Sequence, residues 1–115
     1  MKFVAVCVLT NNAPRLAEFY TTVLREEPLV EGNHYGYNDS QLAVYDPGNI
    51  TVSKDKSMSV MFYVDDLMDE YERLLREIPG IIITSPPERR PWGAFSFWFL
   101  DPDGNTISFI EKKIE

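Results

Sequence analysis

Few residues in this chain belong to the types that attack substrates or bind metal ions. Among 115 residues there is one cysteine, Cys7, and one histidine, His34. A single cysteine excludes an internal disulfide and a thiolate-cluster metal site, and a single histidine excludes any site that needs two imidazoles. Cys7 lies in an apolar run and His34 in a turn-rich segment, so no base stands beside the thiol in sequence. We expect a buried structural thiol and a solvated or locally hydrogen-bonded imidazole.

A second candidate for chemistry is the acidic pattern Asp101-x-Asp103-x-Asn105, which opens like a calcium-binding loop. Its glycine, Gly104, falls at loop position four rather than six, and position twelve is Lys112 in place of a bidentate glutamate. Proline presets φ at the second position and glycine supplies a positive φ at the fourth. The pattern therefore predicts a β-turn that joins two strands.

The aromatic segment at residues 94–100 is the feature most typical of ligand binding. Side chains alternate along a strand, so Ser96 and Trp98 share one face with Ala94 and Leu100, and the three phenylalanines of the segment take the other face. Just upstream stands the pair Arg89-Arg90. This pair is either a solvated loop pair or a contact for an acidic group of a ligand.

The composition predicts one domain that spans residues 1–115. Hydrophobic residues make up 44% and aromatic residues 13% of the chain, enough for a sizeable core. Eleven Lys and Arg against eighteen Asp and Glu give a net charge of −7, which disfavours both general nucleic-acid binding and an anionic membrane surface. We therefore expect no nucleic-acid partner and no membrane partner. The apolar N-terminal run is too short to span a bilayer and has no cleavage site, so we expect a cytoplasmic protein.

The elements that must position these residues follow a repeated order. Residues 3–10 read as a strand buried on both faces, Asn11-Asn12 as a helix cap, and residues 13–24 as an amphipathic helix. Residues 26–53 then alternate between short apolar stretches and turn residues, which predicts a meander of about three strands.

The same order returns in the second half. Residues 58–64 read as a strand, Asp65-Asp66 as a cap, and the following segment as a helix that ends at Pro79-Gly80. Residues 81–84 predict a short strand, residues 85–93 a proline-rich loop, and residues 94–111 a hairpin. Asn12 and Asp66 differ by 54 positions, which predicts two tandem βαβββ units at about 1–54 and 55–115. The expected fold class is α+β, with a cupped mixed sheet and the helices outside.

The paired units and the segment from Trp92-Gly93 through the Asp101-Pro102-Asp103-Gly104 turn resemble the vicinal oxygen chelate superfamily. That superfamily includes glyoxalase I, extradiol dioxygenases, fosfomycin-resistance enzymes and bleomycin-binding proteins. The resemblance covers the whole chain. It implies a ligand cup and a homodimer.

The resemblance also implies four metal-ligand positions on the first and last strands of the two units. On this chain they fall on Ala5, Ser59, Ser108 and near Ala43, with Tyr45 on the same strand face. Alanine cannot ligate a divalent ion, and neutral hydroxyls do so poorly. Glu111 lies three residues from Ser108 and so on the opposite face of the strand. We therefore expect no metal, no cofactor and no metal-dependent catalysis.

These observations favour a metal-free protein that binds a small, mostly apolar or aromatic molecule in its cup. The expected ligand-binding residues are Trp98, Ser96, Tyr63, Tyr45, Ser108, Ser59, Met61, Cys7, Trp92 and Arg90. No catalytic residue is assigned.

Two alternatives stay open. One is a metal-dependent lyase, isomerase or dioxygenase whose ligands are shifted by a one-residue bulge, for instance Tyr45, His34 and Glu111. The other is a structural or regulatory dimer with a filled cup, which a cavity below about 300 Å³ would favour.

Overall fold

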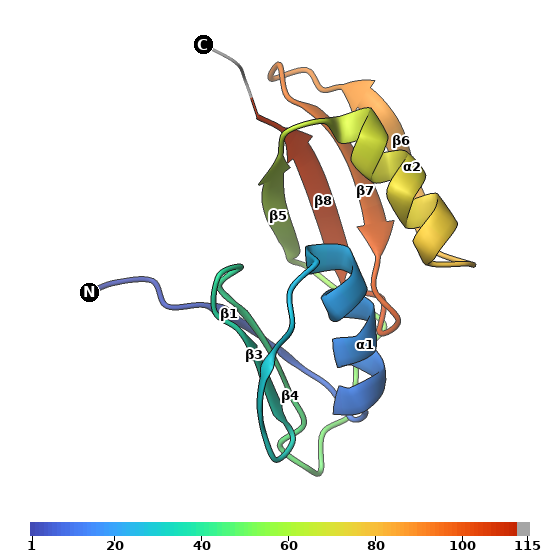
Figure 1. Ribbon diagram of the computed structural model, residues 1–115. Helices are drawn as coiled ribbons and strands as arrows, with labels where there is room; N and C mark the ends of the chain where they lie inside the picture. The colour runs from blue at the N-terminus through green and yellow to red at the C-terminus, as the bar shows by residue number, and fades with distance from the viewer. Residues whose placement is uncertain (113–115) are drawn as a thin grey trace. The chain divides into compact units, whose positions relative to one another are not determined.

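The computed structural model describes residues 1–112 of the chain, which form two compact units. Unit 1 spans Met1–Lys54, and unit 2 begins at Asp55. Each unit contains one helix and a four-stranded mixed sheet (Figure 1). Among the described residues no helix is long and apolar enough to cross a membrane. The two tandem βαβββ units expected from the 54-residue repeat are confirmed.

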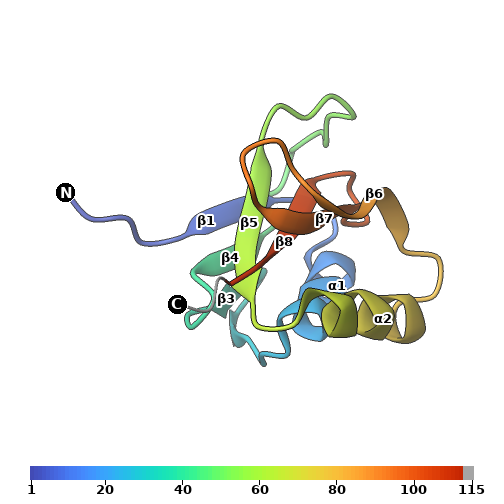
Figure 2. The same ribbon diagram turned by 90° about the horizontal axis from the view of Figure 1, so that it is seen from above.

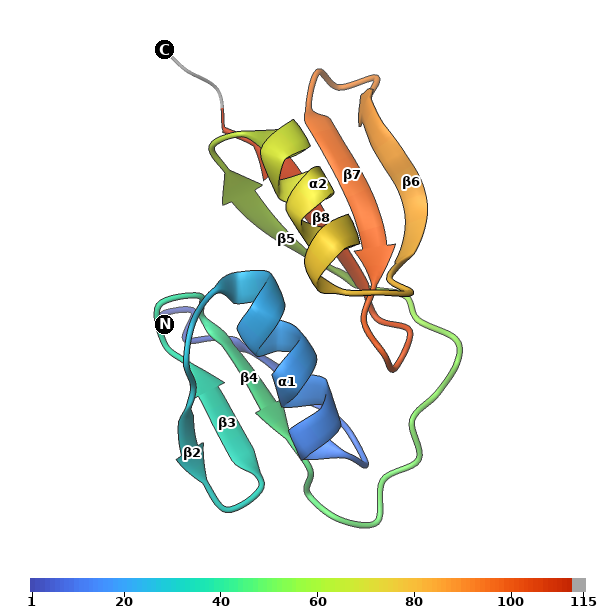
Figure 3. The same cartoon turned by 45° about the vertical axis from the view of Figure 1, so that its right-hand side comes forward.

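Unit 1 runs in the order β1 (Val6–Leu9), α1 (Ala13–Leu24), β2 (Leu29–Glu31), β3 (His34–Tyr37) and β4 (Leu42–Tyr45). Its sheet has the strand order β1-β4-β3-β2, with β1 parallel to β4 and the other pairs antiparallel. The helix covers one face of this sheet (Figure 3). Tyr20, Tyr37 and Leu16 are fully buried there and form the core of the unit.

Unit 2 repeats this topology with β5 (Ser59–Val64), α2 (Leu67–Glu77), β6 (Ile82–Arg89), β7 (Phe95–Leu100) and β8 (Thr106–Glu111). The strand order is β5-β8-β7-β6, and β5 is parallel to β8. Figures 2 and 3 show α2 on one face of this sheet. Phe97 packs there against Tyr71 of the helix and against Phe109, with ring centroids 5.1 and 5.6 Å apart. Phe97 and Phe99 of the aromatic strand thus build the core, as alternation predicts, whereas Phe95, expected on the same face, is only half-buried.

Both helices begin at the predicted caps. The side chain of Asn12 accepts a hydrogen bond from the backbone N–H of Arg15 at 3.3 Å. The side chain of Asp66, 54 residues later, accepts one from the N–H of Asp69 at 3.1 Å. Each cap satisfies a backbone donor that has no partner within its helix.

The predicted hairpin turn is also confirmed. The carboxylate of Asp101 accepts hydrogen bonds from the backbone N–H groups of Asp103 and Asn105, both at 2.9 Å, and from the Asn105 side chain at 2.8 Å. Gly104 has φ of 86°, the conformation for which glycine is suited. The carboxylate therefore closes the turn, in the way expected of a β-turn and not of a calcium loop.

Two sequence predictions about strands are wrong. The apolar run at residues 3–10 is not buried on both faces: Leu9 is 47% exposed, and Cys7 is exposed as well. Within this run, Val8 and Thr10 are buried on one face, whereas Cys7 and Leu9 are exposed on the other. Continuous apolar character does not separate this case from a strand that is buried on both faces.

The second wrong prediction is the proline-rich loop. β6 extends from Ile82 through Arg89 and includes Pro86 and Pro87. Its pairing with β7 shifts register between Ile83 and Ser85 and again between Ser85 and Glu88. Because β6 is an edge strand, residues without an N–H are tolerated in it.

Candidate functional site

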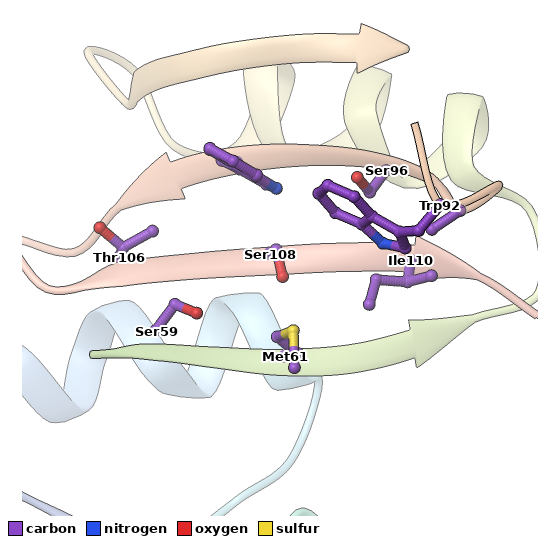
Figure 4. Close-up of a pocket in the computed structure, with 9 residues that line it drawn as sticks. Ser59, Met61, Trp92, Ser96, Thr106, Ser108 and Ile110 are labelled. Atoms are coloured by element: carbon purple, nitrogen blue, oxygen red, sulfur yellow. The ribbon is translucent and has the colours of Figure 1, made fainter. Parts of the chain in front are cut away.

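A cavity of about 250 Å³ lies on the face of the unit 2 sheet that α2 does not cover. We call it the Trp98 cavity. It is lined by Ser59, Met61, Trp92, Ala94, Ser96, Trp98, Thr106, Ser108 and Ile110. Figure 4 shows Ser59 and Met61 on β5, Ser108 and Ile110 on β8, and Trp92 beside Ile110. The alternation of side chains along β5, β8 and β7 places the lining residues of these three adjacent strands on one face.

The walls of the Trp98 cavity combine aromatic rings with neutral hydroxyls. Trp98 is 36% exposed and Met61 is 64% exposed, whereas Ser96 and Ser108 are buried. The cavity contains no ionisable side chain among its described lining residues. Such a surface can stack on a flat apolar ring and can offer a few hydrogen bonds to polar atoms at the ring edge.

Arg90 is not among the described residues that line the cavity, but its guanidinium contacts the ring of Trp98. The guanidinium carbon is 4.5 Å from the centroid of the Trp98 ring, a cation–π contact. Nε donates a hydrogen bond to Ser96 Oγ at 2.8 Å, and a terminal nitrogen donates to Ser85 Oγ at 2.8 Å. Arg90 is buried, so it is neither half of a solvated loop pair nor a rim contact for a ligand.

Trp92 is held at the cavity mouth by a tight turn. The N–H of Arg90 donates to the carbonyl of Ala94 at 2.7 Å, and the N–H of Gly93 donates to the carbonyl of Arg90 at 2.9 Å. Gly93 has φ of 96°, a conformation that other residues rarely adopt. The Arg89 side chain donates to the Gly93 carbonyl at 2.9 Å. This turn projects Trp92 outward, where it is 70% exposed.

A wider and more polar groove of about 1010 Å³ adjoins the Trp98 cavity. We call it the Trp92 groove. It shares Trp92, Ala94 and Ile110 with the cavity and is further lined by Tyr63, Asp65, Arg89, Gly93, Phe95, Glu111 and Lys112. The cavity alone is smaller than the usual range of ligand pockets, about 300–1,000 Å³, so its size by itself favours the structural or regulatory dimer. The shared residues join it to open space in which a larger ligand could continue.

Six of the residues predicted from the sequence to bind ligand line the Trp98 cavity together: Trp98, Ser96, Ser108, Ser59, Met61 and Trp92. Tyr63 lines the groove instead, and Arg90 contacts the ring of Trp98. Tyr45 and Cys7 belong to unit 1, on neighbouring strands of its sheet.

Sequence reasoning missed Thr106, which lines the cavity between the positions of Ser59 and Leu100. The signal was present, because Thr106 is two residues from Ser108 and so shares its strand face.

Cys7 is not the buried structural thiol that the sequence suggested. The residue is exposed on β1. Partial desolvation raises the pKa of its thiol, which keeps it protonated at neutral pH. A protonated thiol is a poor nucleophile and a poor metal ligand.

The residues present do not fit a divalent metal ion. Ser59 and Ser108, at two of the ligand positions that the resemblance implies, supply only neutral hydroxyls to the cavity. Within residues 1–112, no three side chains of His, Cys, Asp or Glu come close enough together to hold an ion. The chemistry of the donor set therefore does not support metal-assisted catalysis at this cavity.

The shifted ligand set is not supported either. His34 and Tyr45 do lie side by side in unit 1, with ring centroids 5.8 Å apart. Glu111, however, accepts a hydrogen bond from the N–H of Leu67 at 3.2 Å. It therefore satisfies a backbone donor at the N-terminus of α2 and lies on the helix side of the sheet. The pairing of β8 with β5 and β7 runs without a register shift, so no bulge moves Glu111 to the other face.

Comparison with known proteins agrees with this architecture. The family model described as Glyoxalase/Bleomycin resistance protein/Dioxygenase superfamily matches residues 2–109. No curated protein matches the chain in sequence.

Solved structures show the same fold at low identity. A protein of unknown function from Agrobacterium tumefaciens str. C58 has a TM-score of 0.81 and 22% identity, over 98% of this chain and 95% of its own. TioX from Micromonospora sp. ML1 has a TM-score of 0.75 and 19% identity, over 96% of this chain and 98% of its own. The fosfomycin resistance protein FosX from Listeria monocytogenes has a TM-score of 0.76 and 11% identity, over 99% of this chain and 95% of its own.

At these identities the structures show a shared fold and no more, whereas the family model covers nearly the whole chain. The chain therefore belongs to the Glyoxalase/Bleomycin resistance protein/Dioxygenase superfamily.

Proposed function

We propose that this protein binds a small, mostly apolar or aromatic molecule in the Trp98 cavity and does so without a metal ion. The observation that carries the proposal is the lining itself. Two tryptophans and one methionine supply apolar contact area. The polar groups among them are the uncharged hydroxyls of Ser59, Ser96, Ser108 and Thr106. Tryptophan offers a large rigid surface for stacking at a low cost in conformational entropy.

The size of the cavity also bears on the ligand. A volume of about 250 Å³ suits one or two fused rings, and the adjoining Trp92 groove gives room for a polar extension. The superfamily includes proteins of both kinds, binders and enzymes. In this chain the neutral donor set favours binding over metal-dependent catalysis. We extend the proposal to a homodimer in the cytoplasm, as expected for a binder of small molecules in this superfamily.

A metal-retention measurement tests the metal-free part of the proposal. The purified protein is incubated with Mn²⁺, Ni²⁺ and Zn²⁺, dialysed, and analysed for metal by mass spectrometry. We expect far less than one ion per chain and a thermal midpoint that is unchanged by chelator, because two serine hydroxyls cannot hold a divalent ion. One ion retained per chain, with a midpoint that falls on chelation, would revive the metal-dependent enzyme.

A fragment screen tests the binding part. Small aromatic fragments are titrated into the protein while the indole N–H signal of Trp98 is followed by NMR. Binding should shift this signal. Trp98→Ala, followed through the indole N–H signal of Trp92 at the same cavity, should abolish binding. Ile82→Ala is the matched control, because Ile82 is an exposed apolar residue of β6 that does not line the cavity. A panel without any hit would favour the structural or regulatory dimer.

A further inference from the structure

Arg90 is a buried cation whose position relative to Trp98 is fixed by hydrogen bonds on several sides. Besides the bonds to Ser96 Oγ and Ser85 Oγ, it donates to the Ser96 carbonyl at 3.1 Å and forms an ion pair with Glu88. A guanidinium has five N–H donors in a rigid plane, so this set of acceptors determines its orientation. The 4.5 Å contact with the Trp98 ring is therefore a built feature of the fold.

The guanidinium of Arg90 and the cavity lie against different surfaces of the Trp98 ring. Trp98 lines the cavity, whereas Arg90 is not among the described residues that line it. One face of the indole is thus covered by the cation, and a ligand must approach from the remaining surface. The partner carboxylate, Glu88, has a side chain that is 58% exposed and is screened by water, so it offsets the buried charge only in part.

A cation on one face of an aromatic ring changes what the other face attracts. The π electrons are drawn toward the cation, so the negative potential of the opposite face decreases. A second cation on that face meets both this weaker potential and direct repulsion from the first. An electron-rich neutral ring or an anionic ring is favoured by the same polarisation.

We infer that Arg90 is a specificity-determining residue that makes the Trp98 cavity select planar aromatic ligands without positive charge. This inference rests on the proposed binding function and narrows its ligand class to neutral or anionic aromatic molecules. The predicted preference is opposite to the one that the overall charge would give, because a net charge of −7 by itself attracts cations. The opposition between local and overall charge makes the inference testable.

Three naphthalene probes of equal size provide the test: 2-naphthoate is anionic, 2-naphthamide neutral, and 2-naphthylmethylammonium cationic. Each is titrated into the full-length protein, and the dissociation constant is taken from the indole N–H signal of Trp98. The chain has two tryptophans, so Trp92→Phe assigns the signals. We expect the wild-type protein to bind the anionic and neutral probes about tenfold more tightly than the cationic one.

The variant Arg90→Gln should abolish or reverse this order. Arg76→Gln is the matched control, since it removes the same charge from an exposed arginine of α2 that lines neither the Trp98 cavity nor the Trp92 groove. It should keep the wild-type order. If Arg90→Gln does not fold, Glu88→Gln replaces it: this change removes the carboxylate partner of Arg90 and should strengthen the preference against the cationic probe.

The possible results distinguish failure of the charge preference from failure of the proposed binding function. If all three probes shift the Trp98 signal with equal affinity, or if the cationic probe binds best, ligand binding stands and the charge preference is wrong. An equal effect of Arg76→Gln and Arg90→Gln would also overturn it, because general electrostatics would then explain the preference. If no probe shifts the signal, the proposed binding function fails and the inference fails with it.

Discussion

Phe97 and Trp98 are adjacent in β7, but the first stabilises the core and the second lines the cavity. Phe97 is fully buried under α2, whereas Trp98 is partly exposed in the cavity on the other face. We expect Phe97→Ala to lower the free energy of unfolding by about 3–5 kcal/mol, because it leaves a cavity in the core. Trp98→Ala should cost less than about 2 kcal/mol but should abolish ligand binding. Urea denaturation and probe titration of both variants check this; equal destabilisation by the two changes would contradict it.

Tyr37 gives unit 1 a dependence on alkaline pH. Its hydroxyl donates to the Ala17 carbonyl at 2.7 Å and lies 2.9 Å from Thr21 Oγ1. Burial raises the pKa of this phenol above the ordinary value of 10.0, and Glu27 and Glu26 add to the shift, while the hydrogen bond from Thr21 opposes it. The folded state therefore keeps the proton at a pH where the unfolded state has lost it.

The sign of the pH effect follows from this difference. Above pH 10 the unfolded chain releases the proton first, so the free energy of unfolding should fall as pH rises toward the folded-state pKa. The slope from one group is at most about 1.4 kcal/mol per pH unit. Urea denaturation from pH 9 to pH 11 checks it. Tyr37→Phe should remove this contribution, whereas Tyr45→Phe, at an exposed tyrosine, should leave it in place.

Strand alternation predicted the sheet face on which several residues of the candidate site lie. That rule placed Trp98, Ser96 and Ser108 on the cavity face and Glu111 on the helix face. It could not reveal that Arg90 is buried. The guanidinium of Arg90 donates to Ser96 on β7 and to Ser85 and Glu88 on β6. The sequence predicted that the strand ends at residue 84, so it did not predict these contacts.

At the scale of elements, the two helix caps are equivalent parts of the repeat. Asn12→Ala and Asp66→Ala should each lower the free energy of unfolding by about 1 kcal/mol, because a backbone N–H at the start of the helix loses its acceptor. The neighbouring substitutions Asn11→Ala and Asp65→Ala are controls, since these exposed residues do not cap the helices. Chemical denaturation measures all four. Equal losses at caps and controls would show that the caps contribute nothing specific.

Element boundaries were predictable where local chemistry sets them. Caps and the Asp101 turn depend on a few consecutive residues, and the structure has them where the sequence places them. β6 was not predictable in this way. Pro86 and Pro87 are local signals for a loop, but pairing with β7 and the edge position of β6 override them.

At the scale of the whole molecule, the segment between the two units contains neither helix nor strand. It runs from residue 46 to residue 58 and includes Lys54, which is exposed, and Lys56. Such segments are preferred sites of proteolysis. Trypsin at low concentration should cut first after Lys54 or Lys56 and release two fragments, which mass spectrometry identifies. Lys54→Gln with Lys56→Gln should slow this cleavage; an earlier cut within α1 or α2 would contradict the expectation.

The repeat was the most informative whole-molecule signal in the sequence. A separation of 54 residues between Asn12 and Asp66 predicted two units of the same topology, and the two sheets have matching strand orders. What alternation and spacing could not predict is which faces stay open. Cys7 and Leu9 are exposed because they lie on the opposite face of β1 from the buried residues Val8 and Thr10, and an unbroken apolar run does not reveal which face is covered.

The two prolines and two register shifts of β6 also bear on aggregation. An edge strand normally offers a row of unpaired backbone groups on which a foreign strand can add. Pro86 and Pro87 have no backbone N–H to donate, and the register shifts on either side of Ser85 interrupt the regular spacing of the remaining backbone groups. The β6 edge is therefore a poor template for intermolecular strand pairing. If two copies of the chain pair through their sheets, we expect the pairing at another edge strand, such as β1 or β5.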